Sequence, residues 1–189
     1  MQMNEDIKLA CQIMERGGVI LYPTDTIWGI GCDATNEEAV RRVFEIKRRA
    51  DSKAMLVLVD TPVKLNYYVK EVPEVAWDLI EMADKPMTII YEGARNLAPN
   101  LLAEDGSVGI RVTSEKFSQH LCQRFRKPIV STSANVSGEA SPANFKEISE
   151  EIKQAVDYIV VSRQDEEVKA KPSSIVKLSA KGVISIIRM

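Results

Sequence analysis

Four cations lie close together in the segment Lys47-Arg48-Arg49-Ala50-Asp51-Ser52-Lys53. Arginine makes bidentate contacts to phosphate and lysine supplies a point charge, so this composition suits a polyphosphate. Residues two apart on a helix point about 200° away from each other, so Lys47 and Arg49 can reach one ligand only if the helix ends between them. Cations that complement a helix dipole, or a solvated run of charges, would explain the same residues without a ligand. The segment alone leaves both interpretations open.

Small hydrogen-bonding side chains follow an apolar run in residues 128–138, PIVSTSANVSG. A second polar group, Thr24-Asp25-Thr26, follows the apolar run that ends at Tyr22 and Pro23. Polar groups just beyond the end of a strand often bind ligands in α/β proteins. Serine, threonine, aspartate and asparagine also satisfy the backbone of turns and long loops. A ligand site and a pair of structural turns therefore both fit these two segments.

The overall composition limits the class of protein. The 189 residues suit one domain spanning 1–189, and 45% hydrophobic with 28% charged residues is typical of a soluble globular chain. The formal net charge of −2 gives no global sign of nucleic-acid binding, so any anion site must be a local basic cluster. No run approaches the ~20 apolar residues that span a bilayer, and the N-terminus lacks the apolar stretch of a signal peptide. We expect a cytoplasmic protein without a membrane partner.

Several catalytic chemistries are also disfavoured. The single histidine, His120, lies in a helical pattern, which argues against a histidine-dependent triad. The chain contains neither GxGxxG nor a P-loop motif, so a nucleotide would be bound in another way. No spaced set of metal ligands and no CxxC pair is present, which predicts no protein-held metal and no disulfide framework. Any Mg²⁺ would arrive with a nucleotide.

Short apolar runs alternate with helical patterns along the chain. The predicted strands are 18–22, 55–59, 87–91, 108–112, 129–131, 158–162, 174–178 and 183–187. The predicted helices are 4–16, 36–47, 62–69, 73–83, 115–126 and 143–156, and Thr35 and Glu38 have the spacing of a capping box at the second of them. This alternation predicts an α/β or α+β fold with one twisted, mixed sheet flanked by helices. The charged residues 164–172 are expected to form an exposed loop.

Taken together, the motifs resemble those of the YrdC-like threonylcarbamoyl-AMP synthases, in their short, single-domain form. They occur in that family's order and cover nearly the whole chain: GGVILYPTDTIWGIGCDA at 17–34, Lys47-x-Arg49 with Lys53, SVGIRV at 107–112, STSANVSG at 131–138 and PSSIV at 172–176. Trp28 stands where the family usually has tyrosine, and Lys177 where aspartate is frequent.

The resemblance implies a fold, a reaction and a set of site residues. The fold would have a concave, basic cavity. The reaction would convert L-threonine, bicarbonate and ATP, with Mg²⁺, into threonylcarbamoyl-AMP and pyrophosphate, and partner proteins would transfer the threonylcarbamoyl group to tRNA. The resemblance assigns the catalytic set to Lys47, Arg49, Ser133 and Asn135. It assigns ATP binding to Arg49, Lys53, Ser107, Asn135 and Arg188, and L-threonine binding to Thr26, Arg111, Ser133 and Ser173 or Ser174.

These residue types suit the implied chemistry. A carbamate and the α-phosphate of ATP are both anionic, so fixed cations and neutral donors can align them without a covalent intermediate. We expect Arg49 and Asn135 to be exposed in the cavity. The alternative is a non-catalytic module of the same fold that binds tRNA or double-stranded RNA through Arg41, Arg42 and residues 47–53. The net negative charge and the scarcity of aromatic residues count against this alternative.

Overall fold

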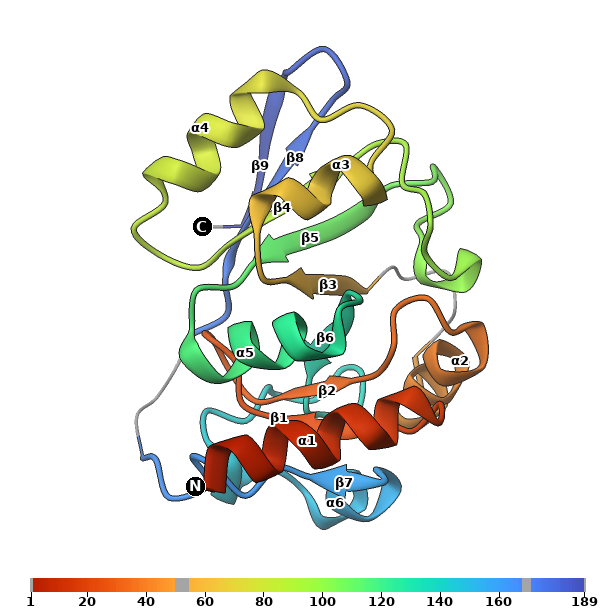
Figure 1. The fold of residues 1–189 in the computed structure, drawn as a ribbon, viewed down its shortest axis with the longest axis vertical. Coiled ribbons are helices and arrows are strands. Elements are labelled where there is room, and N and C mark those ends of the chain that lie inside the picture. The colour runs from red at the N-terminus through yellow and green to blue at the C-terminus, as the bar shows by residue number, and fades with distance from the viewer. Residues whose placement is uncertain (1, 50–54, 168–170, 189) are drawn as a thin grey trace.

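A computed structural model describes residues 2–49, 55–167 and 171–188 (Figure 1). Within these ranges, nine strands form one sheet in the order β7-β1-β2-β6-β3-β5-β4-β8-β9. The strands are β1 (Ile20–Tyr22), β2 (Gly29–Gly31), β3 (Leu56–Val59), β4 (Met87–Tyr91), β5 (Val108–Val112), β6 (Ile129–Ser133), β7 (Tyr158–Ile159), β8 (Ser174–Leu178) and β9 (Ile184–Arg188). The sheet contains three parallel pairs (β1 with β7, β3 with β5, β4 with β8), and its other neighbouring strands are antiparallel. The predicted mixed α/β fold is confirmed.

Helices pack against the sheet (Figure 1). They are α1 (Gln2–Glu15), α2 (Glu37–Ile46), α3 (Leu65–Tyr68), α4 (Glu74–Met82), α5 (Lys116–Phe125) and α6 (Glu150–Ala155), with short 3₁₀ turns η1 (Pro62–Lys64), η2 (Pro99–Leu101) and η3 (Phe145–Glu147). Figure 1 shows α1 and α5 side by side across the sheet. In α1, Ile7, Ala10 and Met14 are buried because their spacing places them on one face of the helix.

The strand β2 was not predicted, because Gly29-Ile30-Gly31 is short and two of its residues have low strand propensity. Pairing with β1 and β6 makes it a strand. The ring of Tyr22 crosses Gly31 and its hydroxyl donates to the carbonyl of Val130 over 3.0 Å. A Cβ at Gly31 would lie 2.5 Å from that ring, so only glycine fits here.

Four local predictions were wrong. The predicted capping box fails because Asn36, not Thr35, caps α2 with its side chain, while the Thr35 hydroxyl donates to Asp33. The single helices predicted over 62–69 and 143–156 are each divided into a 3₁₀ turn and a shorter helix. Ser149 starts a new helix by capping α6, since its hydroxyl accepts from the backbone of Ile152. The strand predicted over 158–162 ends at Ile159.

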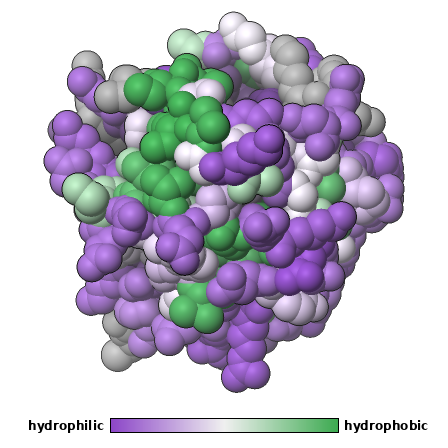
Figure 2. Space-filling view, turned by 90° about the horizontal axis from the view of Figure 1, so that it is seen from above, coloured by the Kyte–Doolittle hydropathy of each residue, from purple (hydrophilic) through white to green (hydrophobic). Residues whose placement is uncertain are grey.

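The end of the molecule formed by β8, β9 and α4 carries apolar surface. Figure 2 looks onto this end and shows apolar residues gathered among polar ones. The exposed large hydrophobic residues here are Met82, Val183, Ile184, Ile186 and Ile187. Within the described ranges, none of the helices has the length and apolar character needed to cross a bilayer.

Candidate active site

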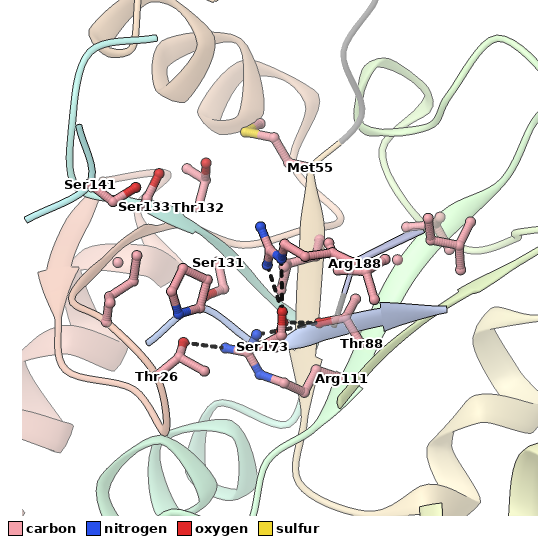
Figure 3. Close-up of a pocket in the computed structure, with 18 of the residues that line it drawn as sticks. Thr26, Met55, Thr88, Arg111, Ser131, Thr132, Ser133, Ser141, Ser173 and Arg188 are labelled. Carbon is pink, nitrogen blue, oxygen red and sulfur yellow. Dashed lines mark hydrogen bonds between the residues drawn. The ribbon is translucent and has the colours of Figure 1, made fainter. Parts of the chain in front are cut away.

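A cavity of about 350 Å³ opens over the middle of the sheet, where β5, β6 and β9 meet the loop that follows Pro23 (Figure 3). Its polar lining consists of three arginines and several hydroxyl groups. They are Thr26, Arg49, Thr88, Ser107, Arg111, Ser131, Thr132, Ser133, Ser141, Ser173 and Arg188. Seven of the residues predicted from the sequence are among them: Thr26, Arg49, Ser107, Arg111, Ser133, Ser173 and Arg188.

Arg111 lies on β5 at the floor of the cavity and is almost completely buried, with 2% of its surface exposed. Its guanidinium is 3.0 Å from Asp25 Oδ1 and donates to the hydroxyls of Thr26 (3.3 Å) and Thr88 (3.4 Å), as Figure 3 shows for the two threonines. Burial raises the pKa of the Asp25 carboxyl, and the charge of Arg111 opposes this rise. The ion pair therefore fixes the planar guanidinium, whose geometry matches a carboxylate.

Arg188 connects the last strand to the cavity wall. Its Nε and Nη2 both donate to the backbone carbonyl of Ser173, over 3.0 and 2.8 Å. The Ser173 hydroxyl lies 2.8 Å from that of Thr88, which also contacts Arg111 (Figure 3). Ser174 does not line the cavity, and its hydroxyl lies 3.5 Å from the carbonyl of Pro86. Of the two serines that the sequence left open, the structure therefore places Ser173 at the cavity.

The helix α2 ends before Arg49, as it must if Lys47 and Arg49 are to approach one ligand. Its last residue is Ile46, and Arg48 adopts a left-handed conformation with φ of 48°, which turns the chain away from the helix axis. Arg49 reaches the cavity, where burial lowers the pKa of its guanidinium. Lys47 does not line the cavity. Lys53 lies outside the described residues.

Lys47 is instead buried behind the cavity wall. Its Nζ donates to the backbone carbonyls of Ser133 (2.5 Å) and Asn135 (2.7 Å). Burial, together with the nearby charge of Arg49, lowers the pKa of the Lys47 ammonium to about 8. In this arrangement, Lys47 connects the end of α2 to the loop after β6, so it can position that loop.

The expectation that Asn135 is exposed in the cavity was wrong. The residue is 9% exposed, and its side-chain amide donates to the carbonyls of Val136 and Glu139, each over 3.0 Å. These bonds hold the loop that follows β6 in a compact turn. Ser133, two residues earlier, does line the cavity.

A comparison with protein families matches residues 12–189 to the Sua5/YciO/YrdC family model, which carries the description "Telomere recombination". The chain belongs to this family. It is 32% identical over 157 residues to threonylcarbamoyl-AMP synthase of Pseudoalteromonas translucida, covering 82% of this chain and 84% of that one. It is 34% identical over 171 residues to a putative threonylcarbamoyl-AMP synthase of Methanocaldococcus jannaschii, covering 90% and 79%.

A solved Sua5/YciO/YrdC structure has the same fold. The structure of P. abyssi Sua5 complexed with L-threonine aligns with a TM-score of 0.81 at 23% identity, over 91% of this chain. The present chain spans about half of the length of that Sua5 protein, 50%. The match at this level of identity concerns the architecture of the sheet and helices.

Three further residues contact the predicted site residues. Asp25 and Thr88 hold Arg111, and Asp105 contacts Ser107, but none of the three had been assigned to the site. Asp25 belongs to the polar segment after Tyr22, which had been noted as a whole. Thr88 and Asp105 were not assigned to the site, because their contacts join segments far apart in the chain or form inside a tight loop.

Proposed function

We propose that this protein is a threonylcarbamoyl-AMP synthase, which makes threonylcarbamoyl-AMP and pyrophosphate from L-threonine, bicarbonate and ATP. One observation carries the proposal: a single cavity gathers Arg49, Arg111 and Arg188 with the serine hydroxyls of the family motifs. The names of the two relatives, at 32% and 34% identity, support the same activity.

In the first step, the amine of threonine attacks the carbon of bicarbonate. A C–N bond forms, water leaves and a carbamate results. We assign the threonine carboxylate to Arg111, whose guanidinium is held in a fixed plane by Asp25 and Thr88. Thr26 and Ser173 are the neighbouring hydroxyls that would contact the rest of the amino acid. Fixing the amine in this way makes a bimolecular step effectively unimolecular, which raises its rate.

In the second step, a carbamate oxygen attacks the α-phosphorus of ATP. An O–P bond forms, and the bond to the departing pyrophosphate breaks. Since nucleophile and target are both anionic, we assign Arg49, Arg188 and Ser133 to the phosphates. We assign Lys47 and Asn135 to holding the loop that follows Ser133. Lys53 remains an expected phosphate ligand outside the described residues.

We expect Mg²⁺ to enter with the phosphates of ATP. Among the described residues, no group of three or more His, Cys, Asp or Glu side chains could hold a metal ion. The ion would then be bound by phosphate oxygens and water, as is usual for nucleotide-bound Mg²⁺.

We also propose that residues 1–189 form one domain, which the single sheet supports.

The RNA-binding alternative receives less support. Three of the arginines that would form its basic surface are paired with acidic side chains: Arg41 with Glu38 and Glu45, Arg42 with Asp157, and Arg48 with Glu151. These pairs reduce the positive charge available to a phosphate backbone.

We propose that proteins acting later in tRNA modification receive the product. The reaction would take place in the cytoplasm with its tRNA target.

The test is pyrophosphate release from ATP, with L-threonine and bicarbonate each present or omitted. We expect release only when both are present. Release without threonine would indicate a different acceptor. ATP binding without release would contradict the synthase activity, and salt-sensitive RNA binding with no small-molecule turnover would favour the alternative module.

A further inference from the structure

Ser107 lines the cavity, and the hydrogen of its hydroxyl is already donated to a carboxylate of the protein. Ser107 Oγ is 2.6 Å from Asp105 Oδ1, and the backbone N–H of Ser107 donates to the same oxygen over 3.0 Å. Hydrogen bonds from Lys177 and Ser107 hold the pKa of Asp105 well below its usual range. An ionised carboxylate only accepts hydrogen bonds, so the Ser107 hydroxyl is the donor in this pair.

The second oxygen of Asp105 is held from the strand β8. Lys177 Nζ, on β8, donates to Asp105 Oδ2 over 2.7 Å. The loop itself is tight: Gly106 has a φ of +73°, its N–H donates to the carbonyl of Ala103, and the N–H of Ala103 donates to the carbonyl of Ser107. The backbone and both carboxylate oxygens are therefore fixed, which fixes the direction of the Ser107 hydroxyl.

This arrangement leaves Ser107 only lone pairs to offer a ligand. The residue is 3% exposed and lines the cavity. A serine oxygen has two acceptor sites besides its single donor. A ligand group at this position must therefore donate a hydrogen bond. The hydroxyl has no hydrogen left to donate, which disfavours a phosphate here, because ionised phosphate oxygens only accept hydrogen bonds.

The spacing along β5 indicates which part of the ligands lies at Ser107. Ser107 and Arg111 are four residues apart in extended chain, which corresponds to about 13 Å. If Arg111 takes the carboxylate of threonine, this amino acid is too short to reach Ser107. The nucleoside part of ATP then lies at Ser107, next to the apolar lining residues Ile90 and Val108.

We propose that Asp105, held by Lys177, is a positioning residue that makes the Ser107 hydroxyl an acceptor for a hydrogen-bond donor on the nucleoside part of ATP. The donor is either the exocyclic amine of the base or a ribose hydroxyl, which share this chemistry. This inference rests on the proposed function for the orientation of the ligands. It makes Ser107 a residue that discriminates between nucleotides.

The experiment measures dissociation constants by titration calorimetry for ATP, inosine triphosphate, 2′-deoxy-ATP and 3′-deoxy-ATP. Inosine triphosphate has a carbonyl in place of the amine, and each deoxy nucleotide lacks one ribose hydroxyl. We expect one of the three analogues to bind about threefold to tenfold more weakly than ATP to the natural protein, the range for one neutral hydrogen bond. The analogue that is affected identifies the donor.

Variants separate the role of Asp105 from a merely structural one. Ser107→Ala should weaken ATP binding and bring the affected analogue within about twofold of ATP. Asp105→Ala should also reduce the difference, because the hydroxyl is no longer held in one direction as an acceptor and can also donate to the carbonyl of inosine triphosphate. Asp105→Asn keeps an oxygen for Ser107, so it should keep the difference. Glu104→Ala, which removes an exposed neighbouring charge, is the matched control and should bind all four nucleotides as the natural protein does.

The results distinguish this inference from the proposed function. Equal affinity for ATP and all three analogues, or a preference among them that Ser107→Ala leaves unchanged, would overturn the inference even in an active enzyme. A preference that Asp105→Ala leaves intact would overturn the positioning role. ATP binding with the expected preference but no pyrophosphate release would overturn the synthase activity alone. Failure to bind any nucleotide would overturn both.

Discussion

Lys47 donates a 2.5 Å hydrogen bond from its buried ammonium to the backbone carbonyl of Ser133. The same ammonium donates to the carbonyl of Asn135, and the backbone of Lys47 accepts from Ser137 over 2.8 Å. The end of α2 and the loop after β6 are thus one unit, although they lie more than 80 residues apart in the sequence. Arg49 and Ser133, which line the cavity, are both carried by this unit.

Replacing Lys47 with methionine should destabilise the protein by at least about 2 kcal/mol. Two buried carbonyls would lose their donor, and each unsatisfied buried group costs about 1–3 kcal/mol. The measurement is urea unfolding at pH 7. Arg48→Met is the matched control, because Arg48 forms only an exposed ion pair with Glu151, and it should change stability by about 1 kcal/mol or less. Equal effects of the two substitutions would contradict the positioning role.

The buried ammonium of Lys47 should also change how the free energy of unfolding depends on pH. Its pKa is lowered from 10.5 to about 8, so between these values the folded state binds fewer protons than the unfolded state. The free energy of unfolding should therefore rise with pH in this window, relative to Lys47→Met, and the difference should be flat below about pH 8. Each unit of pKa difference corresponds to about 1.4 kcal/mol. A difference that falls with pH would mean that the two carbonyls stabilise the ammonium more than burial disfavours it.

The ion pair of Arg111 and Asp25 should behave as a coupled pair. Arg111→Met leaves a buried carboxylate without its cation and should cost about 3–5 kcal/mol near neutral pH. Adding Asp25→Asn removes that charge, so the double variant should be more stable than Arg111→Met alone. Urea unfolding of the natural protein, of Arg111→Met, of Asp25→Asn and of the double variant gives the coupling free energy. Additive effects would show that the 3.0 Å contact contributes nothing.

Removing the cavity cation Arg49 should abolish most of the turnover and leave the fold intact. Phosphate-binding groups in transfer reactions typically contribute at least about a hundredfold to the rate. Arg49→Ala should thus lower pyrophosphate release by about that factor or more, with a circular dichroism spectrum like that of the natural protein. Arg41→Ala is the control, because Arg41 lies on the exposed face of α2 with Glu38 and Glu45. Normal turnover in Arg49→Ala would remove Arg49 from the site.

Local patterns determined most of the elements. The strands over residues 87–91, 108–112 and 174–178 have the predicted bounds, because each is an apolar run between clear breaks. The helix predicted over 36–47 is present as α2, which ends one residue earlier, at Ile46. Long-range pairing was not visible in these patterns, which is why the glycine-rich strand β2 was missed. It is a strand only because β1 and β6 lie on either side of it.

The motifs alone indicated the family and most of the residues around the cavity, since family motifs record residue types in a fixed order. The tertiary structure decided what each side chain does. Lys47 and Asn135 turned out to be buried and bonded to backbone groups, and Asp25 and Asp105 hold Arg111 and Ser107. Which way a side chain points depends on the strands and helices packed around it. The sequence by itself carries the residue types and their order, and folding supplies the directions and the partners.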